Sequence, residues 1–71
     1  METITYTIIG WTDKTAYEDF ARDYKSKHGV YKKFQSMIDS ECYEMIVIRE
    51  EKVFTYCSLK ISKPIELWMA A

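Results

Sequence analysis

The first ten residues alternate between polar and apolar side chains. Threonines occupy one parity and large apolar residues the other: Thr3, Thr5 and Thr7 against Ile4, Tyr6 and Ile8. Successive side chains of a strand point to opposite faces of a sheet, so this period of two predicts a half-buried β-strand over residues 2–10. Gly10 is expected to end it.

A helical period follows. Thr15 and Glu18 have the spacing of a capping box, with Asp13 as a competing N-cap. Apolar or aromatic positions then recur at i, i+3, i+4, i+7 and i+11: Tyr17, Phe20, Ala21, Tyr24 and His28. Gly29 is a typical C-terminal stop. The pattern predicts a first helix that ends near residue 28.

A second stripe begins after Gly29 and consists of Val30, Tyr31, Phe34, Met37 and Ile38. This stripe predicts a second helix over about residues 30–39. One long helix kinked at Gly29 is the alternative, because a glycine inside a helix costs about 1 kcal/mol relative to alanine and does not forbid it. Two helices are favoured.

From residue 42 the pattern returns to β-branched and aromatic runs. Runs over residues 42–49 and 53–61 are separated by Glu50, Glu51 and Lys52, which predicts a hairpin with a charged three-residue loop. The first run is apolar on both parities at its centre, as is typical of an interior strand. Pro64 ends the second run. The apolar segment 65–71 is left open between a strand, a helical turn and an arm that meets another chain.

These elements predict a small single α+β domain over residues 1–71. We expect an antiparallel β-sheet of three or four strands with two helices packed on one face, in the order β-α-α-β-β, with the C-terminal element undecided. A core this small gives the domain only marginal stability. The second face of the sheet is expected to carry Ile46, Ile48, Phe54 and Tyr56. That apolar face, or the tail, predicts a homodimer.

Charge and composition narrow the class of protein. The net charge of −1 argues against a dedicated duplex-binding domain, which is usually strongly basic. The apolar runs fall far short of a membrane span, and the N-terminus lacks the pattern of a secretory signal, so a cytoplasmic location is expected. Cys42 and Cys57 are interpreted as reduced, partly buried residues.

The chain offers little for catalysis. It has one histidine, no metal-ligand motif, and two glycines too far apart for a phosphate-binding loop. A dyad of His28 with Cys42 or Cys57 would need the fold to bring them together, and a capping or partly buried histidine is favoured instead. We therefore predict a protein that is not an enzyme and has no cofactor or metal.

Three groups of residues are candidates for binding. Residues 25–33 carry four lysines and no acid, which leaves −5 on the remainder of the chain. The acidic group, a possible mimic of nucleic-acid phosphates, is Glu41, Glu44, Glu50 and Glu51. The aromatic group is Phe54, Tyr56 and Trp68. The basic group is Lys25, Lys27, His28, Tyr31, Lys32 and Lys33, for which a solvated corner is favoured over a phosphate-binding one.

The favoured function is a non-enzymatic protein-binding domain that acts as a small inhibitor or adaptor of another macromolecule. Small phage and mobile-element anti-defence proteins, including anti-CRISPR proteins, have this size and style, although no motif carries that analogy. The alternative is a small nucleic-acid-binding protein that uses the basic corner and the exposed aromatic residues.

Overall fold

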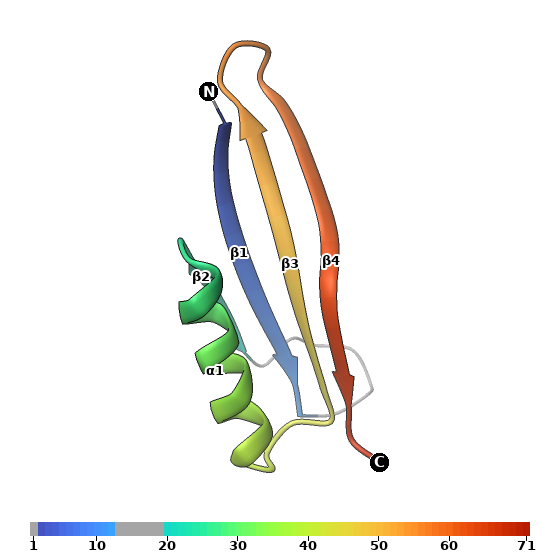
Figure 1. Ribbon diagram of the computed structural model, residues 1–71. Helices are drawn as coiled ribbons and strands as arrows, with labels where there is room; N and C mark the ends of the chain where they lie inside the picture. The colour runs from blue at the N-terminus through green and yellow to red at the C-terminus, as the bar shows by residue number, and fades with distance from the viewer. Residues whose placement is uncertain (1, 13–19) are drawn as a thin grey trace.

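The computed structural model describes residues 2–12 and 20–71. In this part of the chain the elements are β1 (Glu2–Trp11), β2 (Phe20–Tyr24), α1 (Lys27–Asp39), β3 (Met45–Phe54) and β4 (Leu59–Met69). The strands form one antiparallel sheet in the order β2-β1-β3-β4, and α1 packs on one face of it (Figure 1). The small α+β domain with an antiparallel sheet is confirmed.

The helix confirms the second predicted stripe and begins slightly earlier than expected. Ser26 is its N-cap, and the side-chain oxygen of Ser26 accepts a hydrogen bond from the backbone N–H of Gly29 at 3.1 Å. Val30 and Met37 are buried on its inner face. After Ser40 the chain leaves the helix through Glu41, whose φ of 57° is left-handed. Gly29 therefore lies in the first turn of α1, and the prediction that it ends a helix is wrong.

The first predicted helix is wrong where the structure can test it. Residues 20–24 form β2, which pairs with β1 and sets Tyr24 opposite Tyr6 and Phe20 opposite Gly10. A spacing of four residues fits a strand as well as a helix, because it places both aromatic side chains on one face of either. The predicted start at Asp13, Thr15, Tyr17 and Glu18 lies outside the described residues. The described part of the chain thus holds one helix where two were expected.

The predicted hairpin loop is also wrong. Strand β3 runs straight through Glu50, Glu51 and Lys52, and the turn falls at residues 55–58. The charges are tolerated inside a strand because lysines of the same sheet pair with both carboxylates. Strand β4 takes up the apolar tail, so the open question about residues 65–71 is answered by a strand as far as Met69.

The core lies between α1 and the centre of the sheet. Ile8 of β1 lies opposite Ile48 of β3, and these two pack with Ile46, Val30 and Met37, all of them at most 2% exposed. The expectation that Ile46 and Ile48 occupy the second face of the sheet is therefore wrong. The prediction of an interior strand there is confirmed, because β3 lies between β1 and β4.

The helix covers only part of the sheet. In Figure 1 α1 lies beside the lower half of the strands, while the upper parts of β1, β3 and β4 extend beyond it toward the turn. The molecule is accordingly elongated, with extents of 42 × 25 × 16 Å. Among the described residues, no helix lies over the part of the sheet nearest the turn.

At Gly10 the C-terminal end of α1 and the loop that follows it pack closely against the sheet. A Cβ atom at this position would lie 2.5 Å from Cε of Met37 and 2.8 Å from two ring atoms of Tyr43. These distances are far below van der Waals contact. The absence of a side chain at Gly10 is therefore what admits both residues.

We expect Gly10→Ala to lower the free energy of unfolding by about 1–3 kcal/mol, because the Tyr43 ring has to move as well as the flexible end of Met37. Urea denaturation measures this change. Gly29→Ala is the matched control. Its new Cβ would meet the Ser26 hydroxyl at 3.1 Å, and the better helix propensity of alanine, about 1 kcal/mol, offsets that contact. An equal or smaller loss for Gly10→Ala would contradict this explanation.

Candidate functional site

The four acidic residues do not form one surface. Glu41 and Glu44 lie in the connection between α1 and β3, whereas Glu50 and Glu51 are neighbours in β3 and so point to opposite faces of the sheet. A Glu50 carboxylate oxygen lies 3.9 Å from Nζ of Lys52 and 4.0 Å from Nζ of Lys63. Glu51 lies 3.4 Å from Nζ of Lys60. The two central carboxylates are therefore neutralised by neighbouring lysines.

The aromatic group is divided between the two ends of the sheet. Phe54 and Tyr56 contact each other edge to face at the turn, with ring centroids 6.0 Å apart. Trp68 lies opposite Ile46 in β4 and packs, half-buried, against the core. The structure brings Phe54 and Tyr56 together and leaves Trp68 separate from them.

The basic residues gather on α1, and β2 adds a further cation. Lys25, Lys27, His28 and Lys32 are exposed. The half-buried Lys33 places its ammonium 4.8 Å from the centroid of the Phe20 ring. The Arg22 guanidinium lies 5.2 Å from the centroid of the Tyr24 ring. The sequence did not single out Arg22, which lies in β2 within the segment predicted as the first helix.

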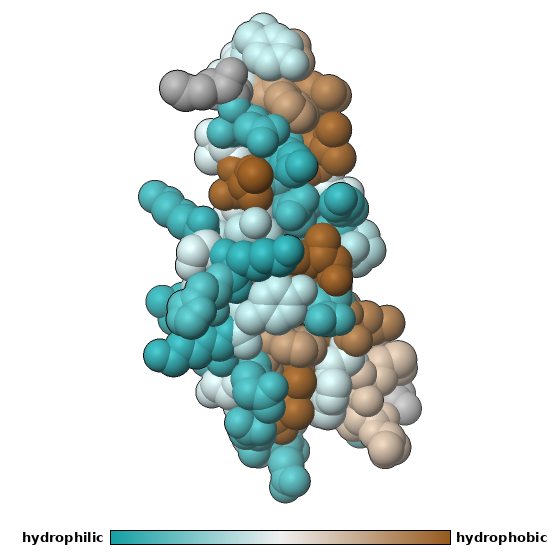
Figure 2. All heavy atoms as spheres, viewed as in Figure 1, coloured by the Kyte–Doolittle hydropathy of each residue, from teal (hydrophilic) through white to brown (hydrophobic). Residues whose placement is uncertain are grey.

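A shallow groove of about 360 Å³ lies between α1 and β2. It is lined by Tyr24, Gly29, Lys32, Lys33 and Ser36. The first turn of α1 has no acidic residue, so the positive end of the helix dipole adds to the lysines around it. Figure 2 shows hydrophilic side chains over this side of the molecule. We call the lysines of residues 25–33 together with Arg22 the basic corner.

Tyr31 does not belong to the basic corner. Its ring packs edge to face on Phe34, with centroids 6.0 Å apart. Burial raises the pKa of the Tyr31 phenol, and the nearby Glu66 carboxylate and Tyr6 raise it further. Tyr6 lies in β1 and Glu66 in β4, and Tyr31 packs against the core, so its ring faces the sheet and away from a ligand on the lysines.

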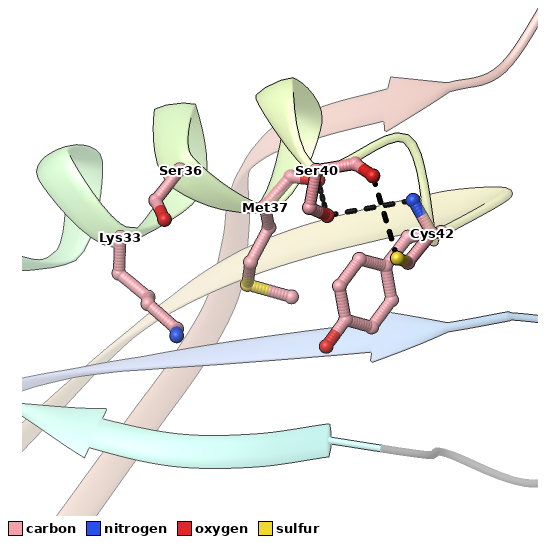
Figure 3. Close-up of a pocket in the computed structure, with 6 residues that line it drawn as sticks. Lys33, Ser36, Met37, Ser40 and Cys42 are labelled. Atoms are coloured by element: carbon pink, nitrogen blue, oxygen red, sulfur yellow. Dashed lines mark hydrogen bonds between the residues drawn. The ribbon is translucent and has the colours of Figure 1, made fainter.

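A smaller hollow of about 180 Å³ lies at the C-terminal end of α1. Figure 3 shows Lys33, Ser36 and Met37 pointing from the helix into it, with Ser40 and Cys42 at its far end. The Ser40 hydroxyl donates to the Met37 carbonyl at 2.7 Å, and the Cys42 N–H donates to that hydroxyl oxygen at 3.4 Å. Ser40 and Cys42 therefore use these polar groups to cap the end of the helix.

Both cysteines are free and exposed. This corrects the interpretation of Cys42 and Cys57 as partly buried. Cys42 lies in the loop after α1, and Cys57 lies in the turn of residues 55–58, which sequence reasoning had placed inside a strand. His28 is exposed on the first turn of α1.

The exposed large apolar side chains gather on one element. Among the described residues they all lie in β4 or the turn before it: Tyr56 (77% exposed), Leu59 (51%), Ile61 (45%), Leu67 (58%) and Met69 (53%). Figure 2 shows apolar atoms at the end of the molecule far from the helix and along the side formed by β4. Because β4 is an edge strand, these side chains flank unpaired backbone.

Leu67 and Met69 are the exposed ends of two apolar rows. The register sets Leu67 beside Val47 and Ile9 in one row, and Met69 beside Met45 and Trp11 in the next: Ile9–Val47–Leu67 and Trp11–Met45–Met69. Both rows lie on the face opposite to α1, because neighbouring Ile46 and Ile48 point toward the helix. The two rows are called the apolar face below.

Comparison with protein-family models, curated proteins and solved structures finds no match. Within residues 2–12 and 20–71, no group of three or more metal-ligating side chains is close enough to hold a metal ion. The helix described in this part of the chain is not long and apolar enough to cross a membrane.

The Tyr31 environment gives a testable titration. Since its pKa is raised above the ordinary value of about 10, the stabilising effect of neutral Tyr31 is present below about pH 10 and is lost as the pH rises through the folded-state value. Glu66→Gln should lower the Tyr31 pKa in part, because burial is the larger cause. NMR of tyrosines labelled at Cζ measures it, with Glu44→Gln as the control carboxylate. An unchanged Tyr31 pKa in Glu66→Gln would refute the assignment.

Proposed function

We propose that this protein is a non-enzymatic protein-binding domain, a small inhibitor or adaptor of another macromolecule, that docks through β4 and the turn before it. One observation carries the proposal. All the exposed large apolar side chains in the described part of the chain lie on this single edge element. Apolar side chains scattered singly over a surface are ordinary, whereas a contiguous apolar surface, such as the apolar face that ends at Leu67 and Met69, indicates an interaction site.

The backbone of β4 supports the same proposal. An edge strand presents unpaired N–H and C=O groups, and a partner strand added there gains main-chain hydrogen bonds as well as apolar contacts. Tyr56 is the most exposed of the apolar residues, and tyrosine is enriched among the residues that dominate binding energy. The partner proposed for this edge is therefore a protein.

Position-specific cross-linking tests the proposal. A photoreactive benzophenone residue replaces Leu67 or Leu59 on β4, or Gln35 on α1 as an exposed control. We expect capture from both β4 positions and none from Gln35 when the chain is expressed in cells. Excess unlabelled chain should suppress the capture, and excess Leu67→Lys chain should suppress it less. Equal capture from α1, or none from β4, would refute this docking element.

A second candidate function, nucleic-acid binding, is favoured by the basic corner. The groove there has lysines on its wall, and Arg22 joins from a second element. Lysines that neutralise phosphates release the counterions condensed on the nucleic acid, which gives a log–log salt slope of about −0.7 per contact for single strands and −0.9 for duplex. Four engaged lysines then give a slope of about −3 to −4.

Lys27→Glu separates binding from stability for this candidate. An acid in the first turn complements the helix dipole, so the free energy of unfolding should rise by about 0.3–1 kcal/mol. Affinity for a short single strand at low salt should fall in the same variant, as fluorescence anisotropy would measure. Lys60→Glu, outside the basic corner, is the control. An equal loss in both variants, or no binding by the native chain, would count against this function.

A further inference from the structure

We propose that two copies of this chain pair through the C-terminal part of β4, antiparallel, with Trp68 on the two-fold axis. The proposal rests on β4 being the docking element and names its occupant as a second copy. The paired stretch runs over residues 66–70. Its geometry follows from which backbone groups of β4 are free, where the strand is blocked, and where the charges of the molecule lie.

One hydrogen bond shows which backbone groups of β4 point away from β3. The N–H of Ala70 donates to the carbonyl of Glu44 at 2.9 Å, so Ala70 points inward, toward β3. Residues of an antiparallel strand alternate between pointing inward and pointing away. Met69 and Leu67 therefore direct their N–H and C=O groups outward, and Trp68 directs its own inward. Two residues of this stretch thus offer a donor and an acceptor each to a neighbouring strand.

Pro64 closes the other end of this free stretch. Strand β4 has one extra residue, Ile65, between the partners of Ile48 and Arg49, which forms a β-bulge. Counting the alternation across the bulge places the nitrogen of Pro64 on the outer edge. A proline nitrogen has no hydrogen to donate, and at an edge it blocks further pairing. Lys60 and Lys63 lie on the other side of Pro64, toward the turn. Lysines are a common protection of exposed edge strands against pairing with other chains.

Backbone N–H and C=O groups that point outward from one copy must face outward-pointing groups of the other copy. This requirement limits the register in which the two β4 strands can pair. With Trp68 on the axis, Leu67 of each copy lies opposite Met69 of the other, and each of these two pairs exchanges two backbone hydrogen bonds. A register centred on Leu67 would instead set Met69 opposite Pro64. A register centred on Met69 would set Leu67 opposite Ala71 and bury less apolar surface. The Trp68 register is therefore preferred.

The same register joins the two apolar faces. Leu67 and Met69 both point away from α1, so in the pair each row continues into the other copy's row. The row that ends at Leu67 in one copy meets the row that ends at Met69 in the other copy. The four exposed side chains at the seam then cover one another, while the two Trp68 residues meet on the helix side.

Charge favours a second copy in this orientation. The upper edge of β4 carries Lys60 and Lys63, which pair with Glu51 and Glu50 of β3 and still have side chains that are each 61% exposed. The end of the molecule beyond Met69 carries Glu41 and Glu44, both exposed. Antiparallel pairing directs this acidic end of each copy toward the basic edge of the other. No like charges meet in the paired stretch, because its charged residue, Glu66, lies opposite Ala70.

Sedimentation velocity of the full chain tests the pairing. The native chain should shift from monomer to dimer between low and high micromolar concentration. Leu67→Pro removes an outward N–H from each copy without touching the bonds to β3, so the dissociation constant should rise by roughly tenfold to a hundredfold. Ser62→Pro changes another outward position, above Pro64, and should leave it unchanged. Circular dichroism checks folding, and Leu67→Glu replaces Leu67→Pro if that variant is unfolded.

Disulfide formation tests the register. In a Cys42→Ser, Cys57→Ser background, Leu67→Cys chain mixed with Met69→Cys chain should cross-link rapidly, because residues opposite each other lie about 5.5 Å apart at Cα. Each chain alone should cross-link more slowly, since its cysteines lie two positions off register. Faster cross-linking of either chain alone would overturn the register. A monomer at high micromolar concentration, or a dimer unaffected by Leu67→Pro and Leu67→Glu, would overturn the pairing.

The outcomes separate this inference from the proposed function. If the chain is monomeric while the benzophenone at Leu67 captures a different protein, docking through β4 stands and the second copy is wrong. If Leu67 captures only its own chain and dimerisation is lost in Leu67→Pro, the second copy stands and a foreign partner at this stretch is wrong.

Discussion

The sheet is longer than the helix that packs on it, and the rest of the structure follows from this mismatch. A helix of 13 residues spans about 20 Å, whereas a strand of 10 residues spans about 33 Å. The buried core of Ile8, Ile46, Ile48, Val30 and Met37 can form only where the two overlap. The close approach at Gly10 fixes that overlap at one end of the sheet. Within the described part of the chain, strand pairing and surface contacts hold the other end.

That uncovered end explains the composition of β3. A central strand buried on both faces would be apolar throughout, yet Glu50, Glu51 and Lys52 occupy its middle. Both faces are accessible to water there, and lysines of β4 lie beside the carboxylates. Such partly exposed ion pairs contribute little to stability. These ion pairs make the uncovered strands compatible with solvent. The exposed large apolar residues of the sheet are then those of β4.

Local patterns predicted the elements whose period is unambiguous. The alternation around Ile4 and Ile8 gave β1, and the stripe from Val30 to Ile38 gave α1. The period fails to decide between helix and strand at Phe20 and Tyr24, since their spacing fits both. The charges at residues 50–52 resemble a loop until their partners on β4 are known, and those partners are set by the register. The lysines of the basic corner followed from the sequence. The exposure of Leu59 and Ile61 depends on how far α1 reaches, whereas that of Leu67 and Met69 depends on the bulge at Ile65, which turns them to the other face.

The extra residue in β4 determines which way its apolar side chains point. Leu59, Ile61, Leu67 and Met69 all have odd numbers, so an unbroken strand would present them on a single side. The bulge at Ile65 reverses the parity between the second and the third. Leu59 and Ile61 therefore look toward the helix side and Leu67 and Met69 look away from it. One strand therefore exposes apolar side chains on both surfaces of the same thin sheet.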